Sequence, residues 1–121
     1  MRSSHRHPRK ILISLCLMAA LSIPGCTGHL ASKPDPNIRK VVFYFEGQAQ
    51  TVCLTGDFNQ WTHDTHCLKA RRGRWSIQLK LPRGPLHYAF IVDGRHWVMD
   101  PKALYVENDG FGKQNSVIVV E

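Results

Sequence analysis

The stretch RWSIQLKLPRGPLHYAFIVDG, residues 74–94, decides the fold class. In its first half, the apolar side chains of Trp75, Ile77 and Leu79 each have a polar neighbour on both sides. This period of two is typical of a β-strand with one buried face. A Pro-Arg-Gly-Pro break at 82–85 separates it from a second apolar run, which ends at an Asp-Gly pair that favours a hairpin turn. The stretch therefore predicts two strands.

Similar runs lie on both sides of this stretch, most of them followed by turn-forming residues, at 41–46, 51–54, 67–70, 96–99 and 116–120. No segment shows sustained helical periodicity. Roughly seven short strands with turns every 8–12 residues predict an all-β sandwich. One face of the 86–92 strand, which carries Tyr88 and Phe90, is expected to lie in the core. The opposite face, with His87, Ala89 and Ile91, is where we expect a ligand.

The N-terminal residues are predicted to be a targeting signal. Residues 1–10 are basic, and the apolar run at 11–23 is shorter than the roughly 20 residues that a membrane-spanning helix needs. A basic head followed by an apolar stretch of about 7–15 residues is typical of a secretory signal peptide. We therefore expect residues 1–25 to be removed on export.

The tetrapeptide IPGC at residues 23–26 resembles a bacterial lipobox, which is cleaved just before a cysteine that then carries acyl chains such as palmitate. The resemblance implies that Cys26 becomes the lipid-modified first residue of the mature protein. The alternative is an ordinary cleaved signal and an incidental thiol. Several acyl chains on one residue anchor a protein firmly. Residues 26–39, which contain two prolines and no periodicity, are then a tether to a domain at 40–121.

The net charge of +7 belongs mostly to the targeting signal. Four of the 16 basic residues lie within residues 1–10, and no acidic residue precedes Asp35. Residues 26–121 contain 12 basic and 9 acidic residues, so the exported part is not notably basic. We therefore expect no nucleic-acid partner, and we interpret the short basic segment RRGR at 71–74 as a solvated hairpin tip.

The four cysteines divide by position. Cys16 lies in the apolar run and Cys26 is assigned to the lipid, which leaves Cys53 and Cys67. In an oxidising compartment these two thiols can form a disulfide that closes a loop of about 15 residues and contributes roughly 3 kcal/mol. The alternative is two separate small core residues, because sequence alone does not place their Cα atoms within bonding range.

A series of spaced motifs now points to a family. LTGDFNQW at 54–61 is followed by LKLPRG at 79–84, YAFIVDG at 88–94, Trp97 and the Asp-Pro pair at 100–101. Together they resemble the glycogen-binding domain of AMP-activated protein kinase beta subunits and the N-terminal early-set module of isoamylases and branching enzymes. The resemblance covers about residues 40–121. It implies an immunoglobulin-like, early-set β-sandwich that binds α-1,4-linked glucans without catalysing a reaction.

The resemblance also implies where sugar binds. The family's two main sugar platforms fall on Trp61 and Trp97. A pyranose ring has an apolar face that can rest on an indole, while its hydroxyls need polar partners at the side. The alternative places both tryptophans in the core, where Trp is usually found. Further sugar contacts are implied in the loop before the last strand, at Phe111, Lys113 and Asn115.

Catalytic and metal sites are not expected. The segment HDTHC at 63–67 contains metal-ligand residue types but no standard zinc spacing and no second cluster, so solvated loop side chains explain it better. No Gly-x-Ser-x-Gly motif is present. Asp57, Asp93 and Asp100 each lie beside a turn residue, where an aspartate caps the backbone. We therefore expect neither an enzyme nor a cofactor.

The expected function is that of a non-catalytic lipoprotein of the bacterial cell envelope that binds glycogen, starch or maltodextrin. Its expected partners are the α-glucan, the membrane through the lipid anchor, and a separate glucan-active enzyme or envelope protein. One position departs from the family, because a sugar-binding lysine of the kinase domain falls on Ala89, which offers no hydrogen bond. The alternative is therefore an envelope protein-interaction module with a degraded sugar site.

Overall fold

A computed structural model describes residues 24–25, 28 and 31–121. Apart from Pro24 and Gly25, the predicted signal peptide lies outside the described residues, as does the predicted lipidation site Cys26. Residues Ser32–Glu121 form one unit built of β-strands. Among the residues that the structure describes, no helix is long and apolar enough to cross a membrane.

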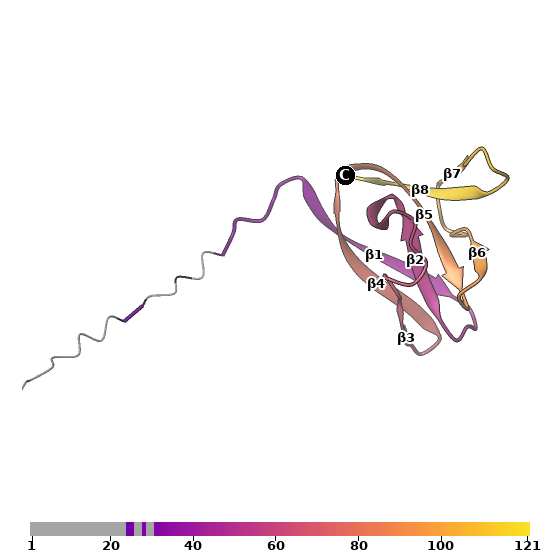
Figure 1. The fold of residues 1–121 in the computed structure, drawn as a ribbon, viewed down its shortest axis with the longest axis horizontal. Coiled ribbons are helices and arrows are strands. Elements are labelled where there is room, and N and C mark those ends of the chain that lie inside the picture. The colour runs from indigo at the N-terminus through magenta and orange to yellow at the C-terminus, as the bar shows by residue number, and fades with distance from the viewer. Residues whose placement is uncertain (1–23, 26–27, 29–30) are drawn as a thin grey trace, which may run out of the picture. The chain divides into compact units, whose positions relative to one another are not determined.

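The described residues form eight strands and one short 3₁₀ turn. In chain order they are β1 (Ile38–Glu46), β2 (Val52–Gly56), η1 (Asp57–Asn59), β3 (Lys69–Arg71), β4 (Arg74–Pro82), β5 (Gly84–Val92), β6 (His96–Val98), β7 (Tyr105–Asn108) and β8 (Gln114–Val120). One sheet has the order β1-β4-β3 and the other has the order β2-β5-β8-β7, with β6 paired to β5 (Figure 1). Every pairing is antiparallel. The predicted all-β sandwich is confirmed.

The core lies between the two sheets and consists of one cluster of buried side chains. Its members are Phe43, Val52, Leu54, Leu68, Leu81, Leu86, Tyr88, Phe90, Val92 and Val120. Phe45, from the three-stranded sheet, meets the fully buried Phe90 of the other sheet edge-on at 5.3 Å between ring centres. Such a pair contributes about 0.5–1.5 kcal/mol beyond its buried area. Trp75 packs against the same cluster, as its alternation with Ile77 predicts.

Two features of the strands were not predicted from the sequence. Tyr105–Asn108 form β7, which was not predicted, because all four residues are exposed and no buried face produces a period. The outer face of β5 is not open along its length, since Ala89 is 0% and Ile91 is 2% exposed. Cys53 on β2 and Trp97 on β6 lie directly opposite Ile91 and share its face. On this face a ligand therefore meets the residues that cover Ala89 and Ile91, and not these two side chains themselves.

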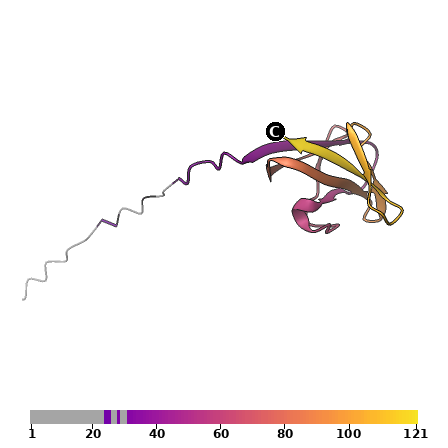
Figure 2. The same cartoon turned by 90° about the horizontal axis from the view of Figure 1, so that it is seen from above.

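A disulfide bond joins Cys53 on β2 to Cys67. The two residues also form an isolated antiparallel bridge, so the segment between them is fixed to the sheet at both ends. This segment contains η1 and Trp61. Figure 2 shows it in magenta, projecting from the sandwich on the side away from β8. The bond therefore restrains the loop that carries one of the two predicted sugar platforms.

Candidate functional site

A tight turn after β2 positions Trp61. A Cβ atom at Gly56 would lie 2.3 Å from the backbone oxygen of His87, so only glycine allows β2 and β5 to approach this closely. The buried Asn59 side chain accepts a hydrogen bond from the Gly56 amide (3.0 Å) and donates one to the Leu54 carbonyl (3.1 Å). Trp61 itself has a left-handed φ of 60°. That conformation costs a non-glycine residue about 1–3 kcal/mol and is typical of functional sites.

The second predicted platform, Trp97, is carried by β6 and stacks on Trp61. The ring centres are 5.6 Å apart and the planes differ by 17°. The Trp97 Nε1–H group donates to the Gln114 carbonyl at 3.0 Å, which ties the indole to β8. Both indoles are half-buried. A pair of this geometry is offset, so part of each ring faces away from its partner.

Because the two indoles stack on each other, they do not form two separate sugar platforms. No sugar ring fits between indoles that already contact each other. The stacking surface on offer is therefore the outward part of the Trp61–Trp97 pair. His63 approaches Trp97 edge-on, with ring centres 6.2 Å apart.

The turn between β7 and β8 presents Phe111 and Lys113. Asp109 Oδ1 accepts hydrogen bonds from the amides of Phe111 (2.7 Å) and Lys113 (3.0 Å). Gly110 and Gly112 both have left-handed φ values, 81° and 88°, which the turn requires. The turn leaves Phe111 93% exposed, so its ring has no apolar cover within the sandwich.

Two polar groups lie beside the indoles. The Nζ atom of Lys113 is 4.6 Å from the centre of the Trp97 ring, which is a cation–π distance. Asn115 is only 8% exposed, and its Oδ1 atom has no hydrogen-bond partner among the described residues. A buried acceptor without a partner costs about 1–3 kcal/mol. Because this oxygen is itself buried, a hydroxyl group bound beside Trp97 would satisfy it only after the Asn115 side chain turns toward the hollow.

These side chains line one shallow hollow of about 480 Å³ on the outer face of the five-stranded sheet. Trp61, Trp97, Phe111, Lys113 and Asn115, the five predicted sugar-contact residues, all belong to its lining. The structure therefore brings together residues from the loop after η1, from β6, from the β7–β8 turn and from β8.

A charged cluster forms another wall of the same hollow. His87 Nδ1 lies 2.8 Å from Asp57 Oδ2, and His87 Nε2 lies 2.7 Å from Glu107 Oε2. The His87 amide also donates to Asp57 Oδ2 at 2.9 Å. Hydrogen bonds to Glu107 and Asp57 raise the pKa of His87 and outweigh the opposing effect of its burial. Both ring nitrogens donate only when the imidazole is protonated, so the cluster favours the imidazolium form.

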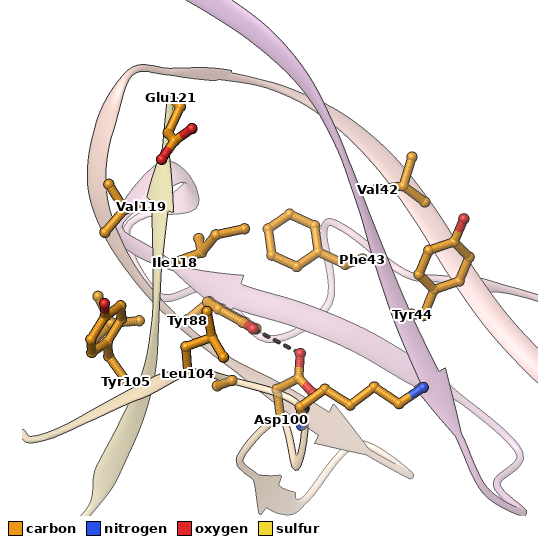
Figure 3. A pocket seen from close by; sticks show the side chains of 13 residues that line it. Val42, Phe43, Tyr44, Tyr88, Asp100, Leu104, Tyr105, Ile118, Val119 and Glu121 are labelled. Atoms are coloured by element: carbon orange, nitrogen blue, oxygen red, sulfur yellow. Dashed lines mark hydrogen bonds between the residues drawn. The ribbon is translucent and has the colours of Figure 1, made fainter.

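A second hollow, of about 490 Å³, lies between β1 and β8 (Figure 3). At its base the Tyr88 hydroxyl donates to Asp100 Oδ2 at 2.7 Å. Burial, and then this hydrogen bond, raises the pKa of Tyr88 above its ordinary value. Asp100 Oδ1 also accepts from the Lys102 amide at 2.8 Å, as expected of a turn cap. The polar groups at this base are thus paired with each other, in contrast to Asn115.

Sequence reasoning missed the charged cluster. Asp57 was interpreted as a turn cap, but its carboxylate reaches across to His87 on β5. The position of His87 on the outer face of β5 was the signal that could have identified this residue. Nothing pointed to Glu107, because β7 was not predicted. Asp93 does cap a turn: its Oδ1 accepts from the amides at positions 50 and 51, and these bonds lower the pKa of Asp93.

Residues 39–121 match the family described as the glycogen recognition site of AMP-activated protein kinase. The chain is 34% identical over 90 residues to Protein FLOURY ENDOSPERM 6, chloroplastic, of Oryza sativa subsp. japonica, covering 74% of this chain and 16% of that protein. It is 33% identical over 89 residues to 5'-AMP-activated protein kinase subunit beta-1 of Sus scrofa, covering 74% of this chain and 70% of that sequence.

Among solved structures, maltogenic amylase from S. marinus has a similar fold. The TM-score is 0.52 with 20% sequence identity, over 69% of this chain and 13% of the amylase chain. At this identity the likeness concerns the fold alone. The chain therefore corresponds to a small part of the amylase and of the rice protein.

Proposed function

The chain belongs to the family of the glycogen recognition site of AMP-activated protein kinase, and we propose that it is a non-catalytic module that binds α-1,4-linked glucan. The proposed site is the hollow around Trp61 and Trp97. The observation that carries the proposal is the convergence of this tryptophan pair with the unpartnered Oδ1 of the buried Asn115.

The chemistry of the hollow suits a glucose polymer. The outward part of the indole pair offers an apolar surface to the C–H face of one pyranose ring. Lys113 Nζ donates to one sugar hydroxyl, and Asn115 Oδ1 accepts from another once its side chain turns toward the hollow. Phe111, exposed at the tip of the β7–β8 turn, extends the apolar surface toward the next sugar unit. The family's lysine is replaced by Ala89, which is fully buried, so affinity depends on stacking more than on charge.

We also propose that the domain is held at the bacterial cell envelope by acyl chains on Cys26. The support is the sequence pattern: a basic head, an apolar run at 11–23 and the tetrapeptide IPGC at 23–26. Residues 27–37 then connect the anchor to β1. In this arrangement the protein keeps an α-glucan close to a separate enzyme or envelope protein that acts on it.

Native gels with and without amylopectin test the glucan-binding proposal. We expect the wild-type protein to be retarded by amylopectin, and Trp61→Ala and Trp97→Ala to run as if the polymer were absent. Central aromatic anchors of a binding site typically contribute about 2 kcal/mol or more, which is roughly a 30-fold loss of affinity. Tyr44→Ala is the matched control, because Tyr44 is 47% exposed but lies on the other sheet.

Wild-type protein that is folded by its near-ultraviolet spectrum yet is not retarded by any α-glucan would contradict the proposal. That result would favour the alternative of a protein-interaction module. Retardation that survives in both tryptophan variants would show that glucan binds elsewhere on the molecule.

A further inference from the structure

The cations of the sandwich are confined to one of its two sheets and to loops. The strands β2, β5, β6, β7 and β8 contain no Lys or Arg. On the three-stranded sheet and its β3–β4 turn, six exposed cations form what we call the basic face: Lys40, Lys69, Arg71, Arg72, Arg74 and Lys80. Glu46 is the only acidic residue on β1, β3 and β4.

Strand register directs the cations of these three strands away from the core. Phe43 on β1 is paired with Ile77 on β4, and both pack on the core side. Side chains alternate along a strand, so Lys40 and Lys80, three residues from these positions, point outward. The basic face is therefore the outer surface of the sheet opposite to the one that carries the tryptophan pair.

The basic face breaks a rule of sheet stability twice. Lys40 lies directly opposite Lys80, and Arg71 lies directly opposite Arg74. Like charges at such positions destabilise an antiparallel pair. Of the six cations, only Arg74 has an ion-pair partner among the described residues, Glu46 at 3.2 Å. Local conflicts of this kind are expected where a surface serves a function. The solvated hairpin tip inferred for residues 71–74 is thus one end of a longer charged surface.

We propose that the basic face docks the domain on a phospholipid bilayer with anionic headgroups. The nine-residue strands β1 and β4 make this face about 30 Å long. Lys40 and Lys80 lie near one end and the cations around the β3–β4 turn at the other. A planar anionic surface meets both ends at once, whereas a small anion meets only one.

Two further features fit a lipid headgroup layer. A hollow of about 580 Å³ is lined by Arg71, Arg72 and Arg74 and also by the Glu46 carboxylate, and its excess of cations provides a place for a headgroup phosphate. Val42 and Tyr44, which are 41% and 47% exposed, lie on the outward side of β1 between the cations. Apolar and aromatic side chains among cations are typical of surfaces that lie at a membrane interface.

This inference rests on the proposed anchor and deepens it. The tether enters the sandwich at β1, which belongs to the sheet with the basic face. The two sheets pack face to face, so their outer surfaces point in opposite directions. Docking by the basic face therefore leaves the Trp61–Trp97 hollow facing away from the lipid, where a glucan can reach it.

Vesicle flotation of the full chain carrying Cys26→Ser tests the proposal without the acyl anchor. Vesicles of phosphatidylcholine with 30% phosphatidylglycerol are compared with pure phosphatidylcholine. The apolar run at 11–23 and the basic residues 1–10 are present in every variant, so the difference between variants on anionic vesicles reports the charge of the basic face. We compare Arg71→Gln/Arg72→Gln with the control Arg83→Gln/Arg95→Gln, which removes two exposed cations that are not on the basic face.

Each cation near an anionic bilayer strengthens binding about fivefold, so the basic-face variant should bind anionic vesicles about 25-fold more weakly. The control should change little, and both variants should still be retarded by amylopectin. Equal losses in the two variants, or no preference of the parent for anionic lipid, would overturn the proposal. Displacement of the parent from vesicles by an equal charge concentration of RNA would assign the face to nucleic acid instead. A failure here leaves the amylopectin result untouched, so the two proposals fail separately.

Discussion

The contacts of His87 with Asp57 and Glu107 should stabilise the folded domain by an amount that depends on pH. His87→Gln removes the positive charge that lies between Asp57 and Glu107 and keeps only one amide donor group. The two contacts of 2.8 and 2.7 Å, on opposite nitrogens of one ring, define the geometry. They place the two carboxylate oxygens about 7 Å apart, where their mutual repulsion in water-like surroundings is about 0.6 kcal/mol.

This repulsion is present with either side chain at position 87, so His87→Gln loses only the two partly exposed ion pairs, at about 0.2–1 kcal/mol each and about 0.4–2 kcal/mol in total. The sign of the pH dependence follows from the raised pKa of His87 in the folded protein. Folding takes up a proton, so the stabilisation is fully present below the unfolded pKa of about 6.5 and is lost as the pH rises through the higher folded value.

Urea unfolding followed by tryptophan fluorescence at pH 6.0 and pH 9.0 measures this effect. We expect His87→Gln to lower the free energy of unfolding by about 0.4–2 kcal/mol at pH 6.0 and by much less at pH 9.0. His96→Gln is the control, because His96 is exposed and makes no ion pair among the described residues. An equal loss at both pH values, or a larger loss at pH 9.0, would refute the reasoning.

Three further predictions concern the scaffold and the anchor. Gly56→Ala should destabilise the domain by about 1–3 kcal/mol or more, because its Cβ would lie 2.3 Å from the His87 backbone oxygen; thermal unfolding against Gly28→Ala, which has open space, checks this. Replacing both Cys53 and Cys67 by Ser should cost about 3 kcal/mol in urea unfolding, and an unchanged midpoint in reducing and oxidising buffer would argue against the bond. Cys26→Ser should move the protein from the membrane to the soluble fraction of the producing cells, and continued membrane association would argue against the lipid anchor.

The sandwich was predictable because one face of its longest strands is buried. The alternation of Trp75 with Ile77 and the run at 86–92 both arise from that burial, and each marks a strand that the structure contains. β7 escaped prediction for the opposite reason, since an edge strand with all four residues exposed has no buried face to impose a period.

The residues of the candidate site were predictable only where they belong to spaced motifs. Trp61 and Trp97 were found in this way, but their contact at 5.6 Å depends on the left-handed backbone of Trp61 and on the position of β6, which no local pattern encodes. The cluster of Asp57, His87 and Glu107 joins three separate segments of the chain. Such a juxtaposition is created by the topology and leaves no spacing in the sequence.

Titration of ¹⁵N-labelled protein with maltoheptaose, followed at the indole N–H resonances, tests the central claim most directly. The chain has three tryptophans, so each resonance reports one position. The Trp75 indole donates to the Gly47 carbonyl at 3.3 Å and lies away from the hollow, so its resonance is the internal reference. The account predicts that the Trp61 and Trp97 signals shift together and saturate with one affinity while the Trp75 signal stays in place. Saturable binding that shifts Trp75 alone, or that leaves the Trp61 and Trp97 signals unmoved, would contradict it.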